Sequence, residues 1–139
     1  MATFQKFNQF VEDLAKGVHN LSTGQLKVAL TNTAPVAANS VYADLTSPLA
    51  TTNLSGATPF NVTTTSAEQT SGTLSLVLVD LTLTATGSVG PFRYVALYND
   101  TPTSPADPLI LFYDYGSSIT LANTETFLID FASTTLTIV

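Results

Sequence analysis

The sequence predicts a mainly β fold, an antiparallel β-sandwich or barrel of about 7–9 strands with one N-terminal amphipathic α-helix. Apolar residues recur at three- and four-residue spacing only before Gly17, and beyond Gly24 they alternate with polar residues at a period of two. Short turn-like segments separate the alternating runs, and no second helical pattern is present to connect parallel strands. The 139 residues are expected to form a single domain, residues 1–139.

The N-terminal segment, residues 1–17, is expected to be the helix, running from Thr3 to about Lys16 and ended by Gly17. Its apolar stripe consists of Phe4, Phe7, Phe10, Val11 and Leu14. A free helix of about 14 residues is marginal in water, so this stripe must be buried. We expect it to be an interaction surface, packed on the protein's own sheet or on a neighbouring molecule. The first is favoured because Leu74–Val79 is apolar on both faces and needs a cover.

Residues 25–139 are expected to form the β-domain. The main predicted strands are Gln25–Asn32, Thr73–Thr86, Phe92–Asn99, Leu109–Tyr115, Ile119–Leu121, Glu125–Phe131 and Thr134–Val139. Between the first two lies a Thr- and Ser-rich excursion, residues 36–71, with short strand candidates at Val41–Leu45 and Phe60–Thr64. A loop of this length seldom lacks both secondary structure and a function, so we expect this segment to carry family-specific contacts.

The composition excludes several functional classes. The absence of Cys excludes disulfides, thiolate metal sites and Cys nucleophiles, and a single His excludes a multi-histidine metal centre. Four Lys and Arg against ten Asp and Glu, a net charge of −6, argue against a nucleic-acid partner. The N-terminus lacks the apolar core of a signal peptide, and no apolar run is long enough for a membrane-spanning helix. We expect neither a membrane partner nor a cofactor.

The only histidine, His19, follows the predicted helix. As a general base it would need a nucleophile and an orienting carboxylate, for which Ser22 and Asp13 are candidates. No G-x-S-x-G motif is present, and each Ser lies in a turn-like context. We therefore interpret His19 as an ordinary polar residue after a helix end.

The carboxylates are dispersed along the chain. Asn99, Asp100 and Asp107 share one loop and could gather an ion, but Asx-turns beside prolines are the favoured interpretation. No pair of carboxylates is indicated for glycosidase chemistry. The sequence therefore predicts no catalytic, cofactor-binding or metal-binding residue, and no enzyme.

Aromatic residues are concentrated in the later strands. The set comprises Phe92, Tyr94, Tyr98, Phe112, Tyr113 and Tyr115. These rings could line a sugar-stacking face, but their alternation favours a place in the sandwich core.

The surface is predicted to be poor in charge. Charged residues make up 10% of the chain, whereas 24 Thr and 12 Ser supply most of the polar side chains. About 25% charge is usual. A charge-poor surface with Thr-lined strand edges is typical of a protein whose edges are covered by assembly.

Four blocks of sequence resemble small virion-associated proteins of tailed bacteriophages. They are F-x-x-F-V-E-D-L-A-x-G-V-H-N-L (Phe7 to Leu21), L-K-V-A-L-T-N-T-A-P (Leu26 to Pro35), G-P-F-R-Y-V-A-L-Y-N-D-T (Gly90 to Thr101) and P-L-I…Y-D-Y-G-S-S-I-T-L (Pro108 to Leu121). The resemblance is weakest over residues 36–71. The blocks encode strands and turns rather than a site motif, so no functional residue is carried over.

The resemblance, together with the surface, implies a non-enzymatic structural protein of a phage particle. The leading expectation is a capsid decoration (cement) protein, a homotrimer on the capsid exterior that is made in the host cytoplasm and binds across major capsid protein subunits. The alternative is a tail or fibre component that binds a host surface glycan through the aromatic set and the loop at 99–108. An enzyme such as a glycan hydrolase has little support.

Overall fold

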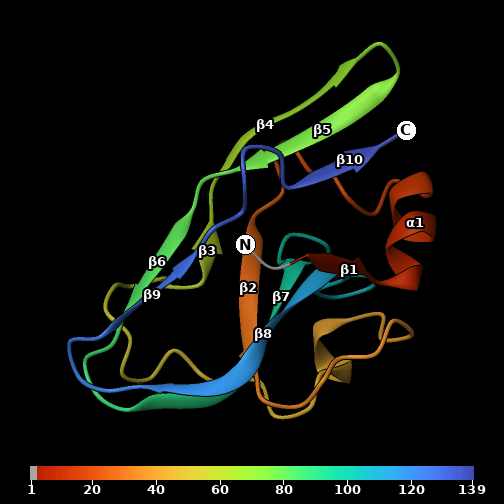
Figure 1. Ribbon diagram of the computed structural model, residues 1–139. Helices are drawn as coiled ribbons and strands as arrows, with labels where there is room; N and C mark the ends of the chain where they lie inside the picture. The colour runs from red at the N-terminus through yellow and green to blue at the C-terminus, as the bar shows by residue number, and fades with distance from the viewer. Residues whose placement is uncertain (1–2) are drawn as a thin grey trace.

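The fold is a two-layer β-sandwich with one short helix, which confirms the predicted class (Figure 1). The computed structural model describes residues 3–139. Over that range ten strands form three antiparallel sheets, so the strand number slightly exceeds the prediction. No helix in these residues is long and apolar enough to cross a membrane.

The first layer is a five-stranded sheet with the order β1-β8-β7-β2-β3. Its strands are β1 (Phe4–Lys6), β2 (Leu26–Thr31), β3 (Asn61–Val62), β7 (Val89–Asn99) and β8 (Leu109–Leu121). The long hairpin β7–β8 forms the centre together with β2, as Figure 1 shows. The alternation over Gln25–Asn32 correctly predicted β2. One face of this strand packs into the larger apolar cluster of the molecule, and its other face packs into the smaller cluster.

The second layer consists of two small sheets, ordered β10-β5-β4 and β6-β9. Their strands are β4 (Thr64–Thr70), β5 (Thr73–Leu78), β6 (Leu81–Thr84), β9 (Thr126–Ile129) and β10 (Leu136–Ile138). The larger core cluster joins them to the main sheet, since it contains Val28 and Leu97 from the first layer and Leu76, Leu83 and Ile129 from the second. The β4–β5 hairpin extends from the body of the molecule at the top of Figure 1.

The other face of the main sheet is covered by part of the Thr- and Ser-rich excursion. Its apolar cluster consists of Phe7, Ala29, Leu45, Ala96, Tyr98, Leu109 and Phe112, with Tyr42 and Tyr94 packed against it. Residues 42–44 form a 3-10 helix, η1 (Tyr42–Asp44), where a short strand was expected over Val41–Leu45. The Asp44 carboxylate accepts the backbone N–H groups of Ser40 and Val41, and this local bonding turns the chain.

The predicted strand Thr73–Thr86 is divided between two sheets. β5 ends at Leu78, one last backbone bond runs from the N–H of Val79 to the carbonyl of Thr63, and β6 then begins at Leu81 and pairs with β9. Asp80 accepts the N–H of Phe131 at 2.9 Å, which fixes the crossing between the sheets.

The predicted break at Gly116-Ser-Ser is absent, and β8 runs continuously from Leu109 to Leu121. Gly116 adopts φ +100 and its N–H donates to Asp114, so the chain bends locally and stays in the sheet. Strand β4 was not predicted, because its residues are almost all polar and show no alternation.

The helix is shorter than expected. α1 covers Asn8–Ala15, whereas Phe4 belongs to strand β1 and pairs with Tyr113 of β8. The N–H of Phe7 donates to the carbonyl of Ile110 at 3.1 Å, so the backbone stays extended until the helix begins. Pairing with β8 satisfies the backbone of these residues and overrides their helical spacing.

The end of the helix confirms the prediction at Gly17. This residue has φ +77, and its N–H donates to the carbonyl of Leu14 at 3.2 Å, while Val18 donates to Asp13. Such a left-handed residue after the last turn is a frequent helix terminator. Residues 1 and 2 of the predicted helical segment lie outside the described residues.

Candidate functional site

The apolar stripe expected as an interaction surface is largely internal. Phe7 is 0% and Phe10 1% exposed, Phe4 and Leu14 are partly buried, and Val11 is 52% exposed. The chief contact of α1 is with β8 and not with Leu74–Val79. Packing on the protein's own sheet therefore accounts for the two buried rings. The stripe is not one continuous helical face, since Phe4 lies on β1 and Val11 points outward.

His19, interpreted as an ordinary polar residue after a helix end, is buried. It is 6% exposed and packs edge-on against Phe10, with ring centroids 5.2 Å apart. Its Nδ1 lies 3.3 Å from Nδ2 of Asn99. The amide oxygen of Asn99 accepts the N–H of Thr101, so its nitrogen faces His19 and Nδ1 acts as the acceptor. The neutral ring then carries its proton on Nε2.

Asp13 is the second buried polar residue beside the helix end. It is 4% exposed and accepts Nε2–H of Gln9 through Oδ1 at 3.1 Å. Within residues 3–139, neither its Oδ2 nor Nε2 of His19 has a hydrogen-bond partner. Burial lowers the pKa of His19, and the Asp13 charge opposes that shift. In the same range no hydroxyl hydrogen-bonds to His19, so the group lacks the nucleophile of a catalytic triad.

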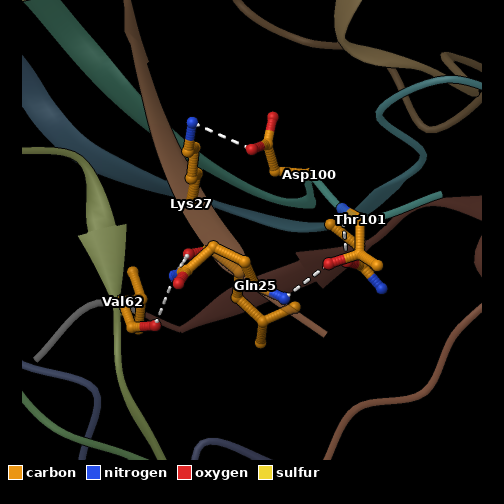
Figure 2. A network of polar contacts seen from close by, with 7 residues as sticks. Gln25, Lys27, Val62, Asp100 and Thr101 are labelled. Atoms are coloured by element: carbon orange, nitrogen blue, oxygen red, sulfur yellow. Dashed lines mark hydrogen bonds and ion pairs between the residues drawn. The ribbon is translucent and has the colours of Figure 1, made fainter. Parts of the chain in front are cut away.

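The loop at 99–108 is tied to the main sheet through polar contacts. Nζ of Lys27 lies 3.0 Å from a carboxylate oxygen of Asp100, as Figure 2 shows. The N–H of Gln25 donates to the hydroxyl of Thr101, and its side-chain amide donates to the carbonyl of Val62 (Figure 2). The first two contacts anchor the loop at the start of β2, and the third joins Gln25 to β3.

The loop brings two carboxyl groups close together. Burial raises the pKa of Asp107, and the neighbouring Asp100 raises it further. Over the described part of the chain, no group of three or more His, Asp or Glu side chains converges as a metal site would require. A cavity of about 400 Å³ lies beside Lys27 and is also lined by Tyr42 and Tyr98, but Asp100 and Asp107 are not among its lining residues.

The aromatic set is divided between the two faces of the main sheet. Tyr94, Tyr98 and Phe112 belong to one apolar cluster, whereas Phe92 and Tyr113 belong to the other. Period-two alternation would put Phe92 on the same face as Tyr94 and Tyr98, but the register of β7 against β8 shifts between Phe92 and Tyr94, and Phe92 lies on the opposite face. The favoured core interpretation is confirmed for Phe92, Tyr98, Phe112 and Tyr113. The set does not form one sugar-stacking face.

One cavity retains an accessible aromatic wall. This aromatic pocket has a volume of about 430 Å³ and is lined by Val95, Tyr113 and Tyr115 of the main sheet and by Phe127–Asp130. Tyr115 is 53% exposed, and its ring meets that of Phe127 edge-on at a centroid distance of 5.5 Å. The volume lies within the range that small ligands or single side chains occupy.

Tyr113 and Asp130 are two of the polar side chains among the residues that line the aromatic pocket. Tyr113 is 7% exposed, and its hydroxyl is buried without a hydrogen-bond partner among the described residues. Burial raises the pKa of Tyr113 to about 12, with a smaller contribution from Asp130, so the phenol is protonated at neutral pH. Asp130 is exposed and accepts the N–H of Ala132 through Oδ1, which leaves Oδ2 open.

The sequence alone did not single out Phe127, Leu128 or Asp130. The segment Glu125–Phe131 carries apolar residues at both odd and even positions. Because only one face of this strand meets the core, an apolar residue is expected on the outer face. Leu128 is that residue, since it is 56% exposed. Comparison with protein-family models, curated proteins and solved structures gives no match for this chain.

Proposed function

We propose that the protein is a non-enzymatic structural component of a bacteriophage virion, and specifically a capsid decoration protein. It binds as a homotrimer on the capsid exterior across neighbouring major capsid protein subunits. Its mechanism is the burial of protein surface: stable interfaces bury about 1,600 Å², and many copies on one lattice add avidity. The four sequence blocks that resemble small virion proteins support this proposal.

The observation that carries the proposal is the open edge of β4. This strand lies at the end of the order β10-β5-β4, and in residues 3–139 no other strand pairs with its outer side. Its seven residues include one charged side chain, Glu68, and no proline. Monomeric proteins protect such edges with charges, prolines or a covering segment. An edge with a single charge and no proline is suited to pairing or packing with another subunit.

Exposed apolar side chains of both layers supply further contact area. Val79 is 49%, Tyr115 53% and Leu128 56% exposed. Single exposed apolar residues are common, but here they accompany a surface with few charges. An assembly interface would remove both the strand edge and these side chains from water.

The test is the copy number of the protein in purified virions, measured by quantitative gel densitometry and located by electron microscopy. A decoration protein gives hundreds of copies spread over the head, on the order expected for a lattice of repeated subunits. A few copies on the tail, or none in the particle, would overturn the proposal.

A paired substitution tests the role of β4. Thr65→Lys places a charge on the open edge, where Thr65 is exposed, and should lower incorporation into particles. Thr52→Lys places the same charge on an exposed turn residue and should leave incorporation unchanged. Equal incorporation of both variants would exclude the β4 edge as an interface.

The second candidate function is a tail or fibre component that binds a host surface glycan. The observation that favours it is the exposed ring of Tyr115 beside Phe127, because sugars stack on accessible aromatic rings. The same copy-number measurement distinguishes it, since a tail component is present in few copies.

A further inference from the structure

The aromatic pocket combines aromatic walls with a carboxylate. Three rings, those of Tyr113, Tyr115 and Phe127, form its walls, and a carboxylate, Asp130, stands at its rim. The Tyr113 hydroxyl is buried in the described structure, so a group in the pocket would meet the exposed Tyr115 ring and the exposed Asp130 carboxylate instead. An exposed ring beside an exposed carboxylate is suited to binding a group from a partner.

The charge of the pocket indicates which kind of group it binds. Every lining side chain is apolar, aromatic or acidic, and no Lys, Arg or His is among them. Ring faces carry partial negative charge, and a carboxylate beside them adds a full one, so both attract a cation and repel an anion. The chain as a whole has a net charge of −6, which favours the approach of a basic partner.

The shape of the pocket adds a second requirement. Val95, Leu128 and Ile129 offer apolar surface between the rings and the rim. A lysine or arginine side chain has an apolar stem and a charged head, and therefore matches an apolar wall that ends at a carboxylate. A sugar needs several converging donors and acceptors. The pocket supplies only one carboxylate and the hydroxyls of its two tyrosines.

The protein's own cations are engaged elsewhere in the described structure. Lys16 pairs with Glu12, Lys27 with Asp100, and Arg93 with Asp114. Lys6, on β1, is not among the residues that line the pocket. No Lys or Arg side chain of residues 3–139 lines the pocket, which leaves it open to a cation from another chain.

We propose that the aromatic pocket is a docking site for a lysine or arginine side chain presented by a protein partner. The head of that side chain lies between the Tyr115 ring and Asp130, and its stem lies along Leu128. Identifying the partner as the major capsid protein rests on the proposed function, whereas recognition of the cation does not.

The experiment titrates the purified protein with N-acetyl-arginine amide and follows the aromatic NMR resonances of Tyr115 and Phe127. The matched neutral probe is N-acetyl-citrulline amide, which has nearly the same shape without the charge. Binding of a single side chain is expected in the millimolar range. Saturable shifts with the arginine probe, about three- to tenfold weaker binding of the citrulline probe and weakening by salt would support the inference.

Two variants that each remove one negative charge test whether binding of the arginine probe depends on Asp130. Asp130→Asn should weaken binding of the arginine probe about three- to tenfold. Glu12→Gln, which removes one negative charge from the exposed face of α1, should leave it unchanged. Both positions are exposed, so the fold is expected to persist, and the dispersion of the NMR spectrum checks this.

Several results would overturn the inference. These are equal binding of the two probes, saturable binding of glucose, galactose or N-acetylglucosamine in place of the arginine probe, or equal weakening by Asp130→Asn and Glu12→Gln. The absence of any saturable shift would do the same. If the arginine probe binds but the protein is absent from virions, only the proposed function fails. If the protein covers the head but the probe does not bind, only the pocket inference fails.

Discussion

The side-chain amide of Asn99 donates to Nδ1 of His19 at 3.3 Å and so joins two residues that are 80 positions apart. Both side chains are buried. The contact fixes the segment after α1 against the start of the loop at 99–108. His19 is the only histidine of the chain, and the burial of its ring couples its protonation to folding.

Lowering the pH is expected to destabilise the protein through His19. The pKa of this residue is lowered from 6.5 in the folded state because burial disfavours the charged ring. As the pH falls below 6.5, the unfolded state binds a proton that the folded state does not, so the free energy of unfolding decreases. Well above 6.5, where the unfolded ring is also neutral, this contribution is constant. Urea unfolding across this range, above the region of about pH 5 where carboxylates titrate, measures the effect.

The control for that prediction is His19→Gln, which keeps a polar side chain and removes the titration. The variant should be less stable at neutral pH but should lose the slope between pH 6.5 and about pH 5. A wild-type protein whose stability is independent of pH in this window would contradict the assignment.

Two neighbouring residues on α1 should respond very differently to truncation. Phe10→Ala removes a side chain that is 1% exposed in the main core and should cost about 3–5 kcal/mol. Val11→Ala removes one that is 52% exposed and should change stability by at most about 0.5 kcal/mol. Chemical denaturation compares them directly. A large loss from Val11→Ala would mean that this side chain is covered in solution, as it would be in an oligomer.

Tyr113→Phe should stabilise the protein or leave its stability unchanged. The substitution removes a buried hydroxyl that has no partner in residues 3–139 and keeps the ring contacts with Phe4 and Phe131. The expected gain is about 0–1 kcal/mol in thermal or urea unfolding. A loss of more than about 1 kcal/mol would show that the hydroxyl is satisfied by ordered water.

Gly24→Ala should destabilise the contact between Asn99 and His19. A Cβ atom at position 24 would come 2.7 Å from the carbonyl oxygen of Asn20 and 2.9 Å from the amide of Asn99. The expected cost is about 1–3 kcal/mol, because the side chain of Asn99 must move away from His19. Ser22→Ala, at an exposed position of the same turn, is the control and should be near neutral. A neutral Gly24→Ala would refute the close approach.

The sequence predicted those parts of the fold that local periodicity determines. The period-two alternation of β2 and the absence of a second helical pattern led to the correct class. The same rule failed at Phe92, where a bulge reverses the side-chain direction, because a register shift depends on the partner strand. It also missed β4, whose polar residues pair with β5 without having a buried face of their own.

The N-terminal stripe was misjudged for a related reason. Three- and four-residue spacing of Phe4, Phe7 and Phe10 fits a helix, yet pairing with β8 fixes Phe4 in a strand. The aromatic pocket could not be predicted from the sequence either. Its walls come from β7, β8 and β9, and only the packing of the two layers brings Val95, Tyr115 and Phe127 together.

The pairing of β1 with β8 affects the order of events during synthesis. Phe4 pairs with Tyr113, so β1 cannot pair until the intervening residues and β8 itself have been synthesised. At about 5–20 residues per second, that wait is roughly 5–20 s. Phe7 and Phe10 remain without their final contacts with β8 throughout this interval. The segment that carries these aromatic residues therefore stays exposed during synthesis, and the main sheet closes only after β8 has been made.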